Sequence, residues 1–129
     1  MPALRTYDYA VVRVVPRVER GEFFNAGVIV SCAADRYLAA RIELDETLLA
    51  ALAPQVDPAP IRAALDAIPL VCAGGPAAGA IGQLSVRERF HWLVAPRSTV
   101  VQTSPVHSGR TADLVVALEQ LMQRLVRRC

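Results

Sequence analysis

The sequence predicts an α+β domain: a small antiparallel sheet packed on one side by three to four helices. The sheet is expected to be a three-strand meander plus a fourth strand. Two observations lead to this fold class. Apolar, β-branched runs typical of strands occupy the first third of the chain, and apolar residues at helical spacing recur over the rest. The length of 129 residues suits one domain, so residues 1–129 are expected to fold as a single unit.

Three strands are expected near the N-terminus and a fourth later in the chain. Residues 7–15 (YDYAVVRVV) are apolar at almost every position, as in a central strand, and Pro16 ends the run because proline cannot donate to a ladder. Residues 26–32 and 37–44 follow after short connections, an order that favours an antiparallel meander. Residues 99–103 (TVVQT) form the expected fourth strand.

The expected helices begin at capping residues and end near prolines. Asp45 and Asp57 are good N-caps, and Ser85 with Glu88 forms a capping box. The last helix is the best defined, because its apolar residues follow helical spacing throughout. The expected ranges are 45–52, 57 to either 69 or 72, 85–95 and 113–128. The glycine- and alanine-rich residues 74–82 are expected to be a loop.

Composition excludes several classes of protein. All fourteen basic residues are arginine and the formal net charge is only +2, which excludes a polybasic arm, so nucleic acid is not an expected partner. Cys32, Cys72 and Cys129 show no CxxC spacing, so we expect reduced thiols, buried or terminal, in a cytoplasmic protein without a metal site. No phosphate-binding glycine motif is present, no cofactor is expected, and no segment is predicted to span a membrane.

The first candidate site is the connection over residues 16–25 (PRVERGEFFN). It carries Arg17, Arg20, Glu22 and Asn25 around two phenylalanines. A solvated hairpin loop, held to the core by the two aromatic rings, explains this composition. Alternatively, the arginines of a mobile loop grip an anionic group while Glu22 and Asn25 orient them.

The second candidate site lies on the helix expected after Ser85. Arg89 and Trp92 are three residues apart and therefore lie on one side of the helix, away from its apolar face. This side is either a polar surface on which Trp92 covers a neighbouring element, or a surface that docks a partner, since Trp and Arg are enriched among interface anchors.

The third candidate site spans residues 96–109 and includes Arg97, Ser98, Gln102 and His107. A Ser–His–acid enzyme would need a carboxylate from elsewhere in the chain, and the GxSxG elbow is missing. Ordinary turns explain the serines equally well. A small enzyme or nucleotide-handling protein with an Arg/Ser/His site is therefore the alternative interpretation.

The runs YDYAVVRVVPRVERGEFFNAGVIV and RERFHWLVAPRSTVVQTSPVHSG resemble the bacterial domain of unknown function 3037 family. The resemblance rests on two ordered blocks: Pro16, Arg17, Glu22, Asn25 and Gly27, then Arg89, Phe90, Trp92, Pro96, Arg97, Ser98, Gln102, Pro105 and His107. It implies no particular reaction. It does imply an association with HipA-like kinases, whose genes often lie nearby, and therefore a partner or regulatory role.

The leading functional hypothesis is a non-enzymatic binding or regulatory module that engages a protein partner, with a HipA-like kinase as the candidate. Homo-oligomers are also compatible with the sequence. If the fourth strand joins the meander, the first and third polar blocks should meet at one edge of the sheet. RNA binding through Tyr7 and Tyr9 is not favoured, because both lie in a strand expected to be buried on both faces.

Overall fold

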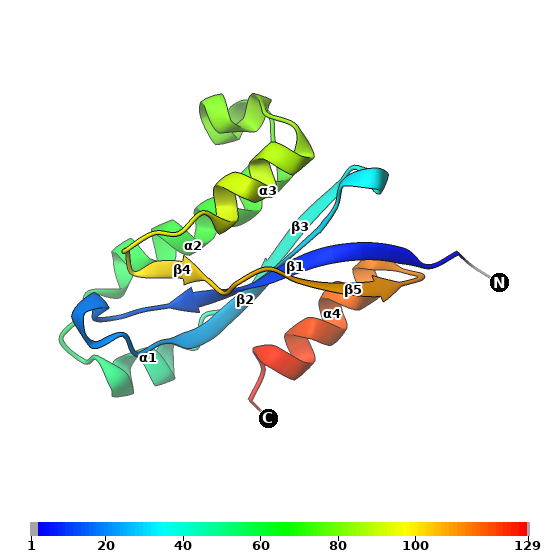
Figure 1. Ribbon diagram of the computed structural model, residues 1–129. Helices are drawn as coiled ribbons and strands as arrows, with labels where there is room; N and C mark the ends of the chain where they lie inside the picture. Colours follow the sequence, from blue (N-terminus) through cyan, green and yellow to red (C-terminus); the bar gives the residue numbers. More distant parts are fainter. Residues whose placement is uncertain (1–2, 129) are drawn as a thin grey trace.

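The computed structural model describes residues 3–128, which form the predicted α+β fold (Figure 1). Three strands make the expected antiparallel meander: β1 (Arg5–Val14), β2 (Phe24–Cys32) and β3 (Tyr37–Ile42). The strand order is β3-β2-β1-β4, where β4 is Val101–Thr103. The sheet places β1 at its centre, as the apolar run predicts.

A fifth strand, β5 (His107–Thr111), also pairs with β1 and corrects the expected number of strands in the sheet. The sequence HSGRT has no apolar alternation, so it does not predict a strand by itself. Its pairing comes from β1, which is ten residues long. Strand β4 covers only the C-terminal end of β1, and β5 satisfies the backbone groups of the other half.

Between β4 and β5 the edge of the sheet is bridged by Ser104, which is buried. Its backbone N–H donates to the carbonyl of Val11 at 2.8 Å, and its hydroxyl accepts from the backbone N–H of Val11 at 2.8 Å. The side chain therefore substitutes for a backbone carbonyl where the strand is interrupted, and β1 keeps both of its hydrogen bonds there.

Four α-helices lie within residues 3–128: α1 (Glu46–Leu52), α2 (Pro58–Ala73), α3 (Val86–Val94) and α4 (Leu114–Leu125). The predicted caps are present. The Asp45 carboxylate accepts from the N–H of Leu48, and Ser85 and Glu88 form a reciprocal capping box. The segment expected as a loop after α2 is instead a 3-10 helix, Pro76–Gln83, kinked at Gly79.

Helices cover both faces of the sheet, so the expectation that they pack on one side only was wrong. Helices α1, α2 and α3 pack on the face that carries Val12, Val14 and Ile29, whereas α4 packs on the face that carries Val28 and Val30. Figure 1 shows α2 and α3 on one side of the strands and α4 on the other. The reason is that β1 and β2 are apolar at successive positions. Their apolar side chains therefore point to both faces of the sheet, and both faces must be shielded from water.

A β-bulge in β2 sets which side chains face α4. Val12 pairs with Gly27 but Arg13 pairs with Asn25, so Ala26 is the additional residue. The bulge lies where strands pack closely, because a Cβ on Gly27 would come within 2.5 Å of the Arg41 carbonyl oxygen. As a result Asn25 lies on the α4 side, where its amide donates to the Leu125 carbonyl at 2.9 Å.

Two further expectations concern membranes and thiols. No single helix in the described part of the chain is long and apolar enough to cross a membrane. Helix α2 and the 3-10 helix together reach that length and apolarity, but the two are bent by 64° relative to each other. Cys32 and Cys72 are free and buried, as expected, and Cys129 lies outside the described residues. Burial raises the pKa of the Cys72 thiol to about 12, so the thiol stays protonated at neutral pH.

Candidate functional site

The candidate residues do not gather at one edge of the sheet but divide among three places. Trp92 and Arg97 lie on the α2/α3 side, against side chains of that core. Gln102 and His107 lie on the α4 side, in register with Arg13 and Tyr9 of β1. The charged residues of the β1–β2 connection remain at the end of the sheet. Trp92 and Arg97 belong to α3 and to the segment that follows it on the α2/α3 side, whereas strand pairing with β1 turns Gln102 and His107 to the α4 side.

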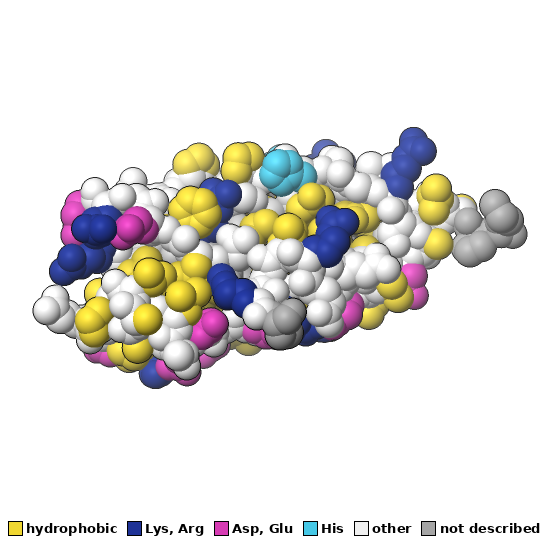
Figure 2. Space-filling model, turned by 90° about the horizontal axis from the view of Figure 1, so that it is seen from below, with side chains coloured by type: hydrophobic (Ala, Val, Ile, Leu, Met, Phe, Trp, Pro, Cys, Tyr) yellow, Lys and Arg dark blue, Asp and Glu magenta, His cyan; other side chains and the backbone are white. Residues whose placement is uncertain are grey.

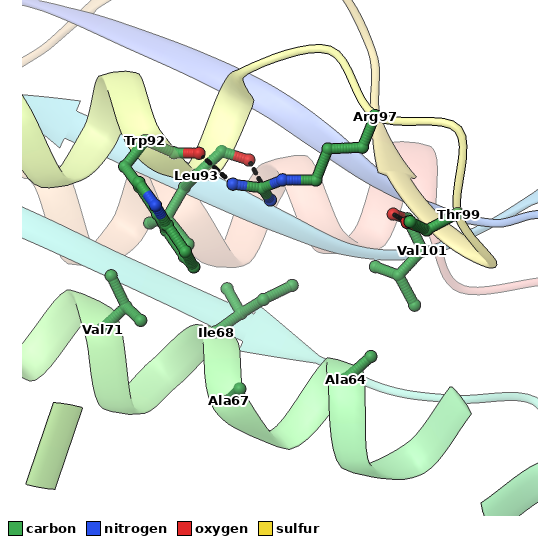
Figure 3. Close-up of a pocket in the computed structure, with 9 residues that line it drawn as sticks. All are labelled: Ala64, Ala67, Ile68, Val71, Trp92, Leu93, Arg97, Thr99 and Val101. Carbon is green, nitrogen blue, oxygen red and sulfur yellow. Dashed lines mark hydrogen bonds between the residues drawn. The ribbon is translucent and has the colours of Figure 1, made fainter. Parts of the chain in front are cut away.

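On the α2/α3 side, an open groove of about 260 Å³ runs between α2, α3 and the segment that leads into β4 (Figure 3). Its lining is mainly apolar: Ala64, Ala67, Ile68, Val71, Trp92, Leu93, Arg97, Thr99 and Val101. Figure 3 shows the α2 side chains along one wall, with the Trp92 indole and the Arg97 guanidinium opposite them. Trp92 remains 41% exposed, so its ring is available to a ligand.

Arg97 holds the Trp92 side of the groove in place. Its Cζ lies 4.4 Å from the centre of the Trp92 ring, which is the distance of a cation–π contact. Its Nη1 donates to the Leu93 carbonyl at 3.4 Å, and its Nη2 donates to the Trp92 carbonyl. These carbonyls end α3, where helix carbonyls lack partners within the helix and attract cations. Arg97 therefore fixes both the helix end and the exposed indole.

Arg89 has a structural role that its place in the sequence did not show. Its Nη1 donates to the carbonyls of Val71 and Cys72, at 2.8 and 2.6 Å, and its Nε donates to the Leu84 carbonyl at 3.0 Å. One side chain of α3 thus closes the C-terminal end of α2 and the 3-10 segment that follows. Gly74 accommodates it, because a Cβ there, at a φ of +75°, would lie 2.9 Å from Arg89 Nη1.

The β1–β2 connection carries mostly paired or exposed charges. Arg20 Nε donates to the Glu22 carboxylate at 2.6 Å, and this hydrogen bond lowers the pKa of the Glu22 carboxyl group. Arg17 is exposed beside this pair. The two phenylalanines differ from the sequence interpretation, because Phe24 is buried whereas Phe23 is 48% exposed. Only one of the two rings therefore holds the loop to the core.

On the α4 side, polar side chains occupy one row across three strands. Gln102 of β4, Arg13 of β1 and Asn25 of β2 lie in register. The Gln102 amide donates to the Thr99 carbonyl at 2.9 Å. Further along the same face, the rings of His107 and Tyr9 are 5.5 Å apart. The α4 face therefore brings together Asn25 from the first polar block and Gln102 and His107 from the third.

A protein-family model described as "Protein of unknown function (DUF3037)" matches residues 9–126. The chain belongs to the DUF3037 family. The match includes all the candidate residues and both faces described above, as the resemblance of the two polar blocks implied. Searches of the curated proteins and of the solved structures gave no match.

The alternative Arg/Ser/His site is not assembled in this DUF3037 structure. Arg97 lies on the α2/α3 side of the sheet and His107 on the α4 side. Ser98 is exposed, and no hydrogen bond of its side chain is recorded among residues 3–128. The described residues also contain no group of three His, Cys, Asp or Glu side chains that could hold a metal.

Sequence reasoning missed Arg13, a residue of the DUF3037 match that lies at the centre of the polar row. The signal was present, because Arg13 is the single charge within the apolar run AVVRVV. A charge inside a buried strand needs either a partner or a function. Its importance became visible only when the pairing of β1 with β2 and β4 was known.

Proposed function

We propose that this DUF3037 protein is a non-enzymatic binding or regulatory module, and that the groove between α2, α3 and β4 docks a segment of a partner protein. The observation that carries the proposal is the 41% exposed Trp92 ring, held by Arg97 against an apolar groove. Tryptophan and arginine are the residues that most often anchor protein interfaces. An ordered, exposed tryptophan beside an apolar groove supports docking.

The lining favours a protein segment over a small molecule. The groove volume of about 260 Å³ is below the range usual for small-molecule pockets, and the groove is open. One turn of α2 beyond Ala67, Leu70 is 48% exposed and extends the apolar surface. A partner segment therefore places an apolar side chain in the groove and continues over α2.

The charge of the groove specifies the chemistry of that segment further. Arg97 is the single charged side chain in the lining of the groove. An acidic residue of the partner, next to the apolar side chain that enters the groove, would therefore pair with the Arg97 guanidinium. Apart from Arg97 and Thr99 the lining has no side chain that could transfer a proton or attack a substrate. This composition supports binding rather than catalysis.

We propose that the protein acts in the bacterial cytoplasm, and we take a HipA-like kinase as the partner to test first. This choice follows from the family resemblance and its gene neighbours. The chain contains one tryptophan, so fluorescence emission reports directly on Trp92. Titration with the purified kinase should give a saturable blue shift as the indole leaves water.

The matched variants are Trp92→Ala in the groove and Val116→Ala on α4, where Val116 is 46% exposed on the opposite layer. Calorimetric titration should show that W92A binds roughly thirtyfold more weakly, or weaker still, because anchor residues contribute about 2 kcal/mol or more. V116A should bind as the wild type does. Equal binding by W92A, or equal losses in both variants, would show that the groove is not the docking site.

A further inference from the structure

Arg13 lies on the face of the sheet opposite the proposed docking groove. It is half-buried near the C-terminal end of β1, between Asn25 of β2 and Gln102 of β4 in the same register. Its guanidinium carbon lies 4.1 Å from the centre of the Phe23 ring. The Phe23 ring and two amide residues in register therefore flank an arginine on the central strand of the sheet.

The charge of Arg13 has no counter-ion among residues 3–128. No carboxylate of this part of the chain lies within 4.0 Å of it, in contrast to the arginines that pair with acids, such as Arg41 and Arg127. Its Nε is shielded from solvent and has no hydrogen-bond partner within the described part of the chain. A partly buried cation with an unsatisfied N–H is costly, and a bound anion would compensate the charge.

The surroundings add positive charge. Asn25, the neighbour of Arg13 across the strands, also accepts a hydrogen bond through its carbonyl from Arg128 Nη2 at 3.4 Å. The carboxylate that pairs with Arg128 among the described residues is that of Asp45, at a distance of 3.9 Å. Figure 2 shows this face: dark-blue side chains lie across it, while the magenta ones gather at its left end and along its lower edge.

We propose that Arg13 is an anion-binding site for the phosphate group of a small molecule. A phosphate monoester carries up to about two negative charges at neutral pH and so gains more than a carboxylate from an arginine without a counter-ion. The planar fork of arginine suits two oxygen atoms of such a group. One central unpaired arginine fits a single phosphate better than a nucleic-acid backbone, which requires several contacts in a row.

Inorganic phosphate is the probe. The side-chain N–H signals of Arg13 and Asn25 are followed by nitrogen-15 NMR while phosphate replaces chloride at constant ionic strength. The wild type should show saturable shifts at both residues. Arg13→Gln should weaken binding by roughly tenfold or more, the loss expected for charge-assisted hydrogen bonds. Arg110→Gln, which removes the same charge from an exposed position of β5, should bind as the wild type does.

Thermal unfolding of R13Q checks the fold, and its midpoint should equal or exceed that of the wild type because an uncompensated charge is removed. If R13Q does not fold, Arg13→Lys provides the test, since it keeps the charge and loses the fork. It should bind phosphate more weakly than the wild type. Wild-type binding by the folded Arg13 variant, or shifts that rise linearly without saturation, would overturn the proposal.

Discussion

Replacing Arg89 by methionine tests how strongly one side chain connects α2 to α3. The variant keeps the apolar stem of the residue and removes its guanidinium. In the folded protein that group donates to three carbonyls, those of Val71, Cys72 and Leu84, at 2.6–3.0 Å. A hydrogen bond from a charged donor contributes about 1.5–3 kcal/mol, but carbonyls at this half-buried position regain water after the substitution.

We therefore expect R89M to lose about 2–3 kcal/mol of the free energy of unfolding, less than the sum of three separate bonds. For a chain of this length the midpoint of thermal unfolding should fall by roughly 6–12 °C. The assay is urea and thermal unfolding followed by circular dichroism. Arg87→Met is the control, because Arg87 is exposed two residues earlier on the same helix.

The control should change stability by less than about 0.5 kcal/mol, as substitutions at exposed positions do. If R89M unfolds at the same urea concentration as R87M, the three hydrogen bonds do not stabilise the fold and Arg89 is free for another role. If R89M is destabilised and still binds the partner when folded, its role is structural, as its contacts indicate.

Three further predictions concern acid, thiol chemistry and packing. The hydrogen bond from Arg127 lowers the pKa of the Glu119 carboxyl group, so its stabilisation is present above the unfolded pKa and is lost as the pH falls through the lowered folded value. Glu119→Gln should therefore reduce the difference in urea midpoint between about pH 7 and about pH 3. Cys72, with a pKa raised to about 12 by burial, should resist thiol reagents in the folded protein and react in urea, as measured in a variant that retains only this cysteine. Gly27→Ala should cost roughly 1–3 kcal/mol in chemical unfolding, because the new Cβ meets the Arg41 carbonyl oxygen.

Each of the three has a clear contrary result. An unchanged pH dependence in E119Q would mean that the network around Arg127 does not stabilise the folded state. Rapid labelling of Cys72 without denaturant would show that α2 opens frequently. A stable G27A protein would show that β2 and β3 can separate at the bulge without loss.

Local chemistry explains which elements the sequence could predict. The caps at Asp45, Ser85 and Asp113 act within a few residues, so the starts of α1, α3 and α4 follow from short segments. Strand β5 could not be predicted in this way, because its pairing depends on β1, about a hundred positions earlier. The cover on both faces could have been predicted, since β1 and β2 are apolar at odd and even positions alike.

The candidate site was harder to predict because side-chain direction depends on register. Gln102 and Arg97 are close in sequence, but Gln102 lies on the α4 face whereas Arg97 lies in the groove against α2. Arg89 looked functional because it stands beside Trp92, whereas its acceptors lie at the end of α2, 17 and 18 residues earlier. Such partners become known only when helices are placed against each other.

The interrupted edge formed by β4, Ser104 and β5 affects how the protein behaves at high concentration. An unbroken edge strand offers a row of free N–H and carbonyl groups on which a strand of another molecule can add. Here the edge is divided into strands of three and five residues, with Pro105, which lacks an N–H, between them. Because Ser104 completes the pairing of β1 from within, the sheet gains this protection against aggregation without leaving its central strand unsatisfied.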